Sequence, residues 1–333
     1  MACPFRITIF RLAGIFLMAV SVRTVSAENI VGIAAMGASE TQGTEFDGSW
    51  VPWLANDRGL NFGPGQNYNV AIGGSSSSDL LVEGQHTEVA NLVASGKVNL
   101  AFLTVGGLDF PPVATKILTH TLNVPAFVNQ VTGNITTAMD TILSAGDTRM
   151  IVLSVPDMTL TGGGQRILTT PALQQPTLDV VNAVNAALKE DVLSRGQVFV
   201  DFEAAMQAWT HNPLIIGGVT INTHDEGDSP EHLWLNDLHV AAVGNGIFAN
   251  LMLSAINKAY GLDIPLISDE LILERAGLSS QYIGYQTSNI DFQSFVTVPV
   301  PEGSPLLLTS LGIALFVIYR RNASTQSMTV SKT

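Results

Sequence analysis

Short apolar runs alternate with helical patterns along most of this chain of 333 residues. Five runs are rich in β-branched residues and end in turn residues, which is typical of buried strands. They span residues 30–35, 68–72, 98–105, 150–155 and 197–202. Apolar residues at helical spacing predict helices over residues 177–195 and 240–260, each followed by a glycine. Strands that alternate with helices predict an α/β fold with a parallel sheet covered on both faces.

The carboxyl ends of the expected strands carry the candidate functional residues. In an open parallel sheet, the functional site lies beyond these ends. The residues expected there are Ser39, Gly73, Gly74, Gly106, Gly107 and Asp201. Residues 211–236 are expected to form a long polar loop with the acidic stretch THDEGDSPEH, and loops of this length in a compact domain are often functional.

Residues 1–27 have the features of a secretory signal peptide. Arg6 and Arg11 provide the positively charged start. Residues 12–20 form a short apolar core, and Val25-Ser26-Ala27 is a small-residue cleavage site. The core is too short to span a membrane comfortably, so cleavage is expected rather than anchoring. We therefore expect an exported protein.

A second non-globular segment is expected at residues 298–333. VPVPEGSP leads into the apolar run LLLTSLGIALFVIY, and Arg320-Arg321 follow. This order resembles the PEP-CTERM sorting signal of Gram-negative bacteria, although Gly303 replaces the last proline of its Pro-Glu-Pro box. The resemblance implies a membrane helix that a sorting protease of the exosortase type acts on. The alternative is a plain C-terminal membrane anchor, for which about 14 apolar residues are few.

The body between these segments, residues 28–297, is expected to be one domain, located in the cell envelope or outside the cell. The chain has a formal net charge of −13, and its two terminal segments hold six of the 15 Lys and Arg residues but one of the 28 Asp and Glu residues. A body this acidic is expected to repel nucleic acid and anionic lipid surfaces. The single cysteine, Cys3, lies in the expected signal peptide, so the body has no disulfide and no thiol nucleophile.

Four stretches follow one another along the chain, each at an expected strand end or just ahead of a helix. They are MGASETQG (36–43), NYNVAIGGSSSSDLL (67–81), FLTVGGLDF (102–110) and LWLNDLHVAAVGNG (233–246). In this order and at these separations they resemble the sequence blocks of the SGNH (GDSL-like) hydrolases, over most of residues 29–280. SVPDMTLTGGG (154–164) is similar to the loop after the fourth strand of that family. The resemblance implies a three-layer α/β/α sandwich with a flavodoxin-like parallel sheet.

The resemblance also implies roles for particular residues. Ser39 would be the nucleophile and His239 the general base, because a serine hydroxyl is a poor nucleophile unless an imidazole takes its proton. The backbone N–H groups of Ser39 and Gly74 would form part of the oxyanion hole, which stabilises the charge of the tetrahedral intermediate. Asn236 would be the third group, which holds the imidazole in its tautomer and orientation.

Of the positions that depart from the family pattern, two remove groups that would stabilise charge. Leu108 stands where the family has an asparagine whose side chain donates to the oxyanion, and losing such a donor typically costs about 10²–10³ in kcat. Asn236 stands where the family has an aspartate, and this change can cost about 10⁴ in kcat when the wrong imidazole tautomer is favoured. Asp237, Asp225 and Asp228 are candidates to assist His239.

Two functions therefore stay open. One is an exported serine esterase or lipase that hydrolyses a carboxylic ester through an acyl-enzyme on Ser39. Its substrate could be a small ester, a lipid or an acylated polysaccharide, of which the surface location slightly favours the polysaccharide. The other is a catalytically impaired cell-surface or matrix protein that binds glycan or lipid on the same scaffold. No cofactor is expected, and no metal, because the acidic residues near His232 match no metal-binding loop.

Some polar and aromatic residues have simpler structural interpretations. Asp109 is expected to bond a neighbouring loop rather than substrate. Trp50, Trp53, Trp209 and Trp234 could line a carbohydrate platform, but single tryptophans more often pack in a core or at its rim.

Overall fold

A five-stranded sheet organises the residues that the computed structural model describes, which are residues 30–43, 48–211, 213–279 and 290–299. Its strands, in spatial order, are β1 (Ile33–Gly37), β2 (Leu100–Thr104), β3 (Arg149–Leu153), β4 (Val198–Val200) and β8 (Val296–Thr297). The first four are parallel, and β8 pairs antiparallel with β4. β1 and β2 are aligned from Ile33 opposite Leu100 to Gly37 opposite Thr104, so both strands end at the same level.

The fifth expected strand, residues 68–72, is not a full strand. It lies beside β1 and exchanges three backbone hydrogen bonds with it, but forms a single β-bridge, between Ala35 and Asn69. The ladder is incomplete because the Gly37 N–H, which would otherwise be directed at the Val70 carbonyl, donates to Gln85 Oε1 at 2.9 Å instead. The Asn69 side chain accepts from the Ala71 N–H at 3.3 Å and donates to Thr41 O at 2.6 Å. With this segment counted second, the spatial order is 2-1-3-4-5, the flavodoxin-like order, whose binding crevice opens between β1 and β2.

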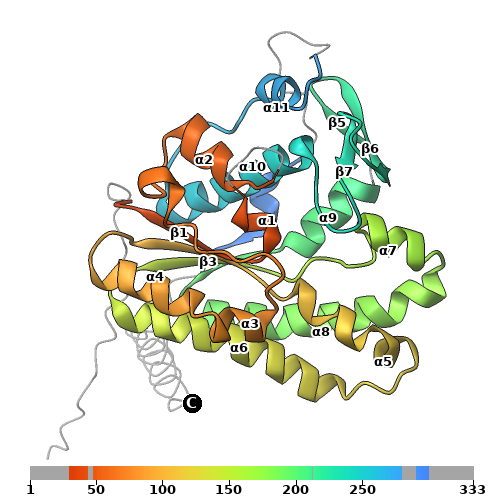
Figure 1. The fold of residues 1–333 in the computed structure, drawn as a ribbon, viewed down its shortest axis with the longest axis horizontal. Coiled ribbons are helices and arrows are strands. Elements are labelled where there is room, and N and C mark those ends of the chain that lie inside the picture. The colour runs from red at the N-terminus through yellow and green to blue at the C-terminus, as the bar shows by residue number, and fades with distance from the viewer. Residues whose placement is uncertain (1–29, 44–47, 212, 280–289, 300–333) are drawn as a thin grey trace, which may run out of the picture. The chain divides into compact units, whose positions relative to one another are not determined.

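Helices cover both faces of the sheet and form the outer two of three layers (Figure 1). The longer helices on one face are α4 (Gln85–Ala94), α6 (Val124–Ala145) and α8 (Pro171–Ser194), with α3 (Ser77–Val82) and α5 (Ala114–Leu118) beside them. On the other face lie α1 (Ser39–Gln42), α2 (Val51–Arg58), α9 (Phe202–His211), α10 (Ala242–Tyr260) and α11 (Asp269–Arg275). The two helices expected from the sequence are therefore present, α8 beginning six residues early. The α/β/α architecture is confirmed.

Alternate strand residues build the two halves of the core, as the period of two in a strand requires. Ala34 and Met36 of β1 belong to the half that packs against α4, α6 and α8. On the opposite face, the Trp50 ring packs edge-on against Phe102 of β2 at a centroid distance of 4.9 Å, and Phe248 of α10 lies 6.2 Å from Trp50. All the side chains of β1 and β2 are buried, so the strand ends are held by packing on both faces.

Residues 211–236 were expected to be a loop, and that expectation is wrong. They contain a small sheet of β5 (Leu214–Ile216), β6 (Val219–Glu226) and β7 (His232–Trp234). Ile216 pairs with Val219, and the two residues between them, Gly217 and Gly218, have φ values of 53° and 81°. A two-residue turn with both φ values positive is a typical hairpin connection, so the Gly-Gly pair was the overlooked signal.

The expected signal peptide and residues 300–333 of the expected sorting segment lie outside the described residues. Within the described part of the chain, no helix combines the length and the apolar character needed to cross a membrane.

Candidate active site

Ser39 lies in a tight turn between β1 and α1. The strand ends at Gly37, Ala38 has an extended conformation, and Ser39 is the first residue of α1. Gly37 has a φ of 148°, and a Cβ atom there would lie 2.1 Å from the Thr104 carbonyl oxygen. No residue other than glycine fits at this approach of β1 to β2. The turn therefore presents Ser39 beyond the carboxyl end of the sheet.

His239 faces Ser39 from the turn between β7 and α10. Its Nε2 atom lies 2.8 Å from Ser39 Oγ, and its Nδ1 atom lies 2.9 Å from Asn236 Oδ1. The turn is closed by the Leu235 N–H, which donates to the His239 carbonyl at 2.9 Å. The structure thus brings Ser39, His239 and Asn236 together in one hydrogen-bonded chain, with 200 residues between the serine and the histidine.

The orientation of the Asn236 amide determines which nitrogen of His239 carries the proton. Asn236 Oδ1 accepts from the backbone N–H groups of Leu238 and His239, both at 3.1 Å. A flipped amide would direct its NH₂ group at two donors, so the oxygen must face them and also Nδ1. Nδ1 is therefore protonated, and Nε2 is free to accept the Ser39 proton. The Asn236 amide therefore favours the His239 tautomer that leaves Nε2 unprotonated and facing Ser39 Oγ.

A mostly apolar pocket of about 110 Å³ opens beside this chain of groups. Ser39 and His239 line it together with apolar side chains, which are Val105, Leu108, Met158, Phe202, Met206, Trp209, Leu233, Trp234, Leu238, Val240 and Phe248. Leu108 therefore borders the pocket but supplies no hydrogen-bond donor. Trp209 and Trp234 are 2% and 3% exposed, and Trp50 and Trp53 are fully buried, so none of the four forms an exposed platform for a carbohydrate.

The Gly73-Gly74 turn lies next to Ser39. A Cβ atom at Gly73 would lie 3.6 Å from Ser39 Cβ, and the Gly73 N–H donates to Gln42 Oε1 at 2.7 Å. Gly74 follows with a φ of 91°, in the left-handed region that favours glycine. Among the described residues that line the pocket, the glycines are Gly106 and Gly107, not Gly74. Gly74 is thus adjacent to the Ser39 turn but is not among the residues that line the pocket.

Several carboxylates near the site have partners elsewhere. Asp237 pairs with Arg166, and Asp225 Oδ2 accepts from Asn222 Nδ2 at 2.8 Å, so neither contacts His239. Asp109 is buried and accepts from both the N–H and the hydroxyl of Ser77 at 2.8 Å, so it bonds the first residue of α3 rather than the loop that was expected. Burial raises the pKa of Asp109, and these bonds from Ser77 oppose the rise.

Glu40, the residue after Ser39, is a pocket-lining group that sequence reasoning missed. Burial raises the pKa of its carboxyl group, and hydrogen bonds from the Glu40 N–H, the Thr104 hydroxyl and the Ala38 N–H oppose the rise. The sequence could have indicated this position, because Glu40 directly follows the candidate nucleophile and must lie near it. Over the described ranges of the chain, no three His, Asp or Glu side chains are placed to hold a metal ion together.

The chain was also compared with known proteins. No family model matches it, and no curated protein is similar to it. Among solved structures, it is similar to an acetylxylan esterase from Geobacillus stearothermophilus, with 14% identity over 72% of this chain and 98% of the other, and a TM-score of 0.42. It is also similar to phospholipase A1 from Streptomyces albidoflavus NA297, with 18% identity over 65% of this chain and 95% of the other, and a TM-score of 0.41. Evidence for a function therefore comes from the contacts among Ser39, His239 and Asn236.

Proposed function

We propose that this protein is a serine esterase that hydrolyses a carboxylic ester through an acyl-enzyme on Ser39. The observation that carries the proposal is the continuous hydrogen-bonded chain from Ser39 Oγ through His239 to Asn236 Oδ1, with both distances below 3 Å. A nucleophile bonded to a base that a third group orients is the arrangement that nucleophilic acyl transfer requires.

In the first half of the reaction, Ser39 Oγ attacks the ester carbonyl carbon while its proton moves to His239 Nε2. The imidazolium that forms keeps its Nδ1–H bonded to Asn236 Oδ1. The tetrahedral intermediate collapses when the C–O bond to the alcohol breaks, and the alcohol leaves with the proton from Nε2. In the second half, Nε2 takes a proton from water, whose oxygen attacks the acyl carbon to form a second tetrahedral intermediate. The C–O bond to Ser39 then breaks, the acid leaves, and the proton on Nε2 returns to Ser39 Oγ.

Charge on the intermediate would be stabilised by backbone donors. The N–H groups of Ser39 and Gly74 are the candidates, since the Gly73-Gly74 turn adjoins Ser39. Leu108 cannot add the side-chain donor, so we propose a slower enzyme than a complete oxyanion hole would permit. The neutral Asn236 likewise gives the imidazolium less stabilisation than a carboxylate.

The pocket supports substrates with an apolar acyl group. Aromatic and aliphatic side chains dominate its lining, with Trp209, Phe202 and Phe248 among them. Phe202 stacks on Phe248 at a centroid distance of 4.5 Å, so the two rings form one apolar part of the pocket wall. Each CH₂ group buried there should contribute about 0.8 kcal/mol, or roughly fourfold in kcat/KM. We therefore favour lipid or small apolar esters over acetylated polysaccharide.

The ends of the chain support an extracellular setting for this activity. We propose that residues 1–27 direct export and that residues 298–333 tether the protein to a membrane, at least until a sorting protease acts. Expression in a Gram-negative host, with fractionation and mass spectrometry of both mature termini, tests this. Cleavage after Ala27 is the expected result, and an intact N-terminus on cytoplasmic protein would contradict it.

Hydrolysis of p-nitrophenyl esters by the purified protein tests the proposed function. The wild type should turn over the butyrate about 15 times more efficiently than the acetate, because two more CH₂ groups are buried. Ser39→Ala and His239→Ala should lose turnover. Ser95→Ala, at an exposed serine after the end of α4, should keep it. If wild type and Ser39→Ala are equally inactive but both bind the esters, the protein is a binding protein on this scaffold.

A further inference from the structure

The short helix α7 (Gly162–Ile167) packs closely against the turn that carries His239. The Gly163 N–H donates to the Asp237 carbonyl at 2.9 Å. A Cβ atom at Gly163 would lie 3.1 Å from Asp237 Cβ, and one at Gly162 would lie 3.1 Å from the Asn236 carbonyl oxygen. The two glycines therefore allow α7 to approach this turn closely, whereas larger residues at these positions would push the helix away from it.

Arg166 of α7 extends this contact with its guanidinium group. One nitrogen, Nη1, pairs with Glu226 Oε1 at the end of β6, and the other, Nη2, pairs with Asp237 Oδ1. The planar fork of an arginine has a fixed geometry, so a contact to two carboxylates fixes their relative positions. Asp237 is the residue directly after Asn236, so Arg166 acts one residue away from the group that orients His239.

The helix is itself anchored, so it can serve as a fixed support. The Thr161 hydroxyl caps it by accepting from the Gly164 N–H at 3.0 Å. Gln165 Nε2 donates to the Thr223 carbonyl of β6 at 3.1 Å, and Gln165 Oε1 lies 2.8 Å from His224 Nδ1. α7 therefore joins β6 to the His239 turn through several independent contacts, in addition to the two ion pairs.

We propose that α7 clamps the turn of residues 236–239, with Arg166 as a positioning residue for the Ser39–His239 pair. The clamp keeps the Asn236 oxygen at His239 Nδ1, which in turn leaves Nε2 directed at Ser39 Oγ. The kinetic part of this inference rests on the proposed esterase function, but the geometric part does not.

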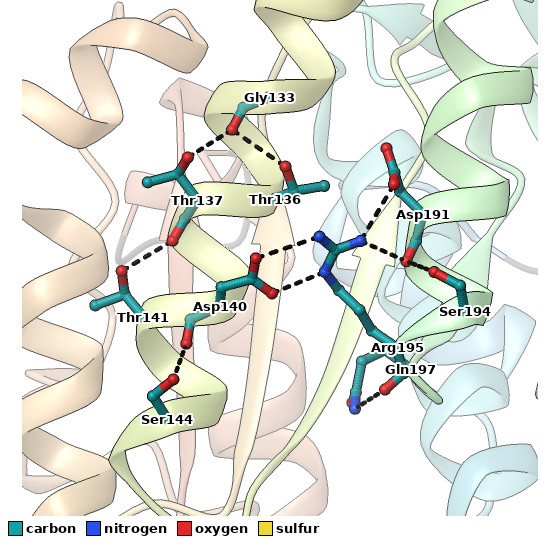
Figure 2. Close-up of polar contacts among 10 residues, drawn as sticks. All are labelled: Gly133, Thr136, Thr137, Asp140, Thr141, Ser144, Asp191, Ser194, Arg195 and Gln197. Carbon is teal, nitrogen blue, oxygen red and sulfur yellow. Dashed lines mark hydrogen bonds and ion pairs between the residues drawn. The ribbon is translucent and has the colours of Figure 1, made fainter.

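The chain offers a matched control for the loss of such an arginine. Arg195 also bridges two carboxylates, those of Asp140 on α6 and Asp191 on α8, as Figure 2 shows. It joins α6 to the end of α8, in the helical layer on the face of the sheet opposite α10 (Figure 1). Arg195→Ala therefore removes the same charge and the same kind of contact without touching the His239 turn.

The experiment compares Arg166→Ala, Arg166→Lys and Arg195→Ala with wild type. Two readouts are the kinetics on p-nitrophenyl butyrate and the ¹⁵N NMR signals of the His239 ring, assigned by their loss in His239→Ala. Arg166→Ala should lower kcat about tenfold with KM within about twofold, because positioning affects the reacting geometry more than binding. It should also reduce the share of His239 with its proton on Nδ1. Arg166→Lys should restore part of both, and Arg195→Ala should change neither.

The outcomes separate the two proposals. If Arg166→Ala keeps both kcat and the ring signals of wild type, the clamp is wrong. If Arg195→Ala lowers kcat as much as Arg166→Ala, the effect is one of general stability, and the clamp is also wrong. If wild type has no turnover but the ring signals change in Arg166→Ala alone, the clamp stands and the esterase function fails. Asp237→Asn should reproduce the loss of Arg166→Ala, and the double variant should add little to it.

Discussion

Replacing Asn236 with aspartate should make this protein a faster esterase. Asn236 Oδ1 already accepts from two backbone N–H groups and from His239 Nδ1, and a carboxylate can accept the same three bonds. The geometry should therefore be kept, while a negative charge is added next to the imidazolium that forms during attack. Asn236→Leu is the contrasting variant, because it removes the acceptor without adding charge.

The magnitude follows from the distance between the groups. The Nδ1 to Oδ1 separation is 2.9 Å, which puts the two charge centres about 4 Å apart. Attraction at 4 Å is about 4 kcal/mol at an effective dielectric constant of 20 and about 1 kcal/mol in water. Asn236 is exposed, so screening favours the lower end. A gain of about 1–2 kcal/mol corresponds to roughly 5- to 30-fold in kcat.

Steady-state kinetics on p-nitrophenyl butyrate, with kcat separated from KM, provide the assay. Asn236→Asp should raise kcat with little change in KM, and Asn236→Leu should lower kcat by about 10²–10⁴ because the tautomer is no longer held. A drop in kcat for Asn236→Asp, or no effect of Asn236→Leu, would refute the assigned orientation of His239.

Three further predictions concern residues around the same pocket. Leu108→Asn should raise kcat by about tenfold or more if its amide reaches the oxyanion, and unchanged kinetics would place the oxyanion elsewhere. Gly37→Ala should destabilise the fold by at least about 2–3 kcal/mol, because its Cβ atom would lie 2.1 Å from the Thr104 carbonyl; urea unfolding measures this, and a loss below about 1 kcal/mol would contradict it. Burial raises the pKa of Glu40 above 4.5, so its stabilising protonated form is lost as pH rises through the raised pKa. The melting temperature of Glu40→Gln should therefore gain on that of wild type as pH rises above about 4, and a constant difference would contradict the burial argument.

The fold could be predicted from the sequence where packing determines it. β1 and β2 are buried on both faces, and such strands read as continuous apolar runs. Residues 68–72 have the same apolar pattern but lie at the sheet edge, where the Gln85 side chain accepts the Gly37 N–H that a full ladder would use. The β5–β6 hairpin was missed because the polar residues of β6 concealed the pattern, although the Gly217-Gly218 turn was visible.

The site was predictable in its residue types but not in its hydrogen bonds. The order of the four sequence blocks predicted one site with Ser39, His239 and Asn236, and the structure places these residues within hydrogen-bonding distance, Ser39 to His239 and His239 to Asn236. The sequence does not indicate the orientation of an amide side chain. The Asn236 oxygen is oriented by the Leu238 and His239 N–H groups, which converge on it only in the folded turn. The contact of Arg166 with Asp237 likewise joins residues 71 positions apart.

Covalent labelling of Ser39 tests the central claim most directly. The purified protein is incubated with a fluorophosphonate, and the modified peptide is identified by mass spectrometry. We expect an adduct on Ser39 in wild type and none in Ser39→Ala. Labelling should be slower by orders of magnitude in His239→Ala, because the imidazole activates the Ser39 hydroxyl. Absence of an adduct in folded wild type, or equal labelling in His239→Ala, would contradict the central claim.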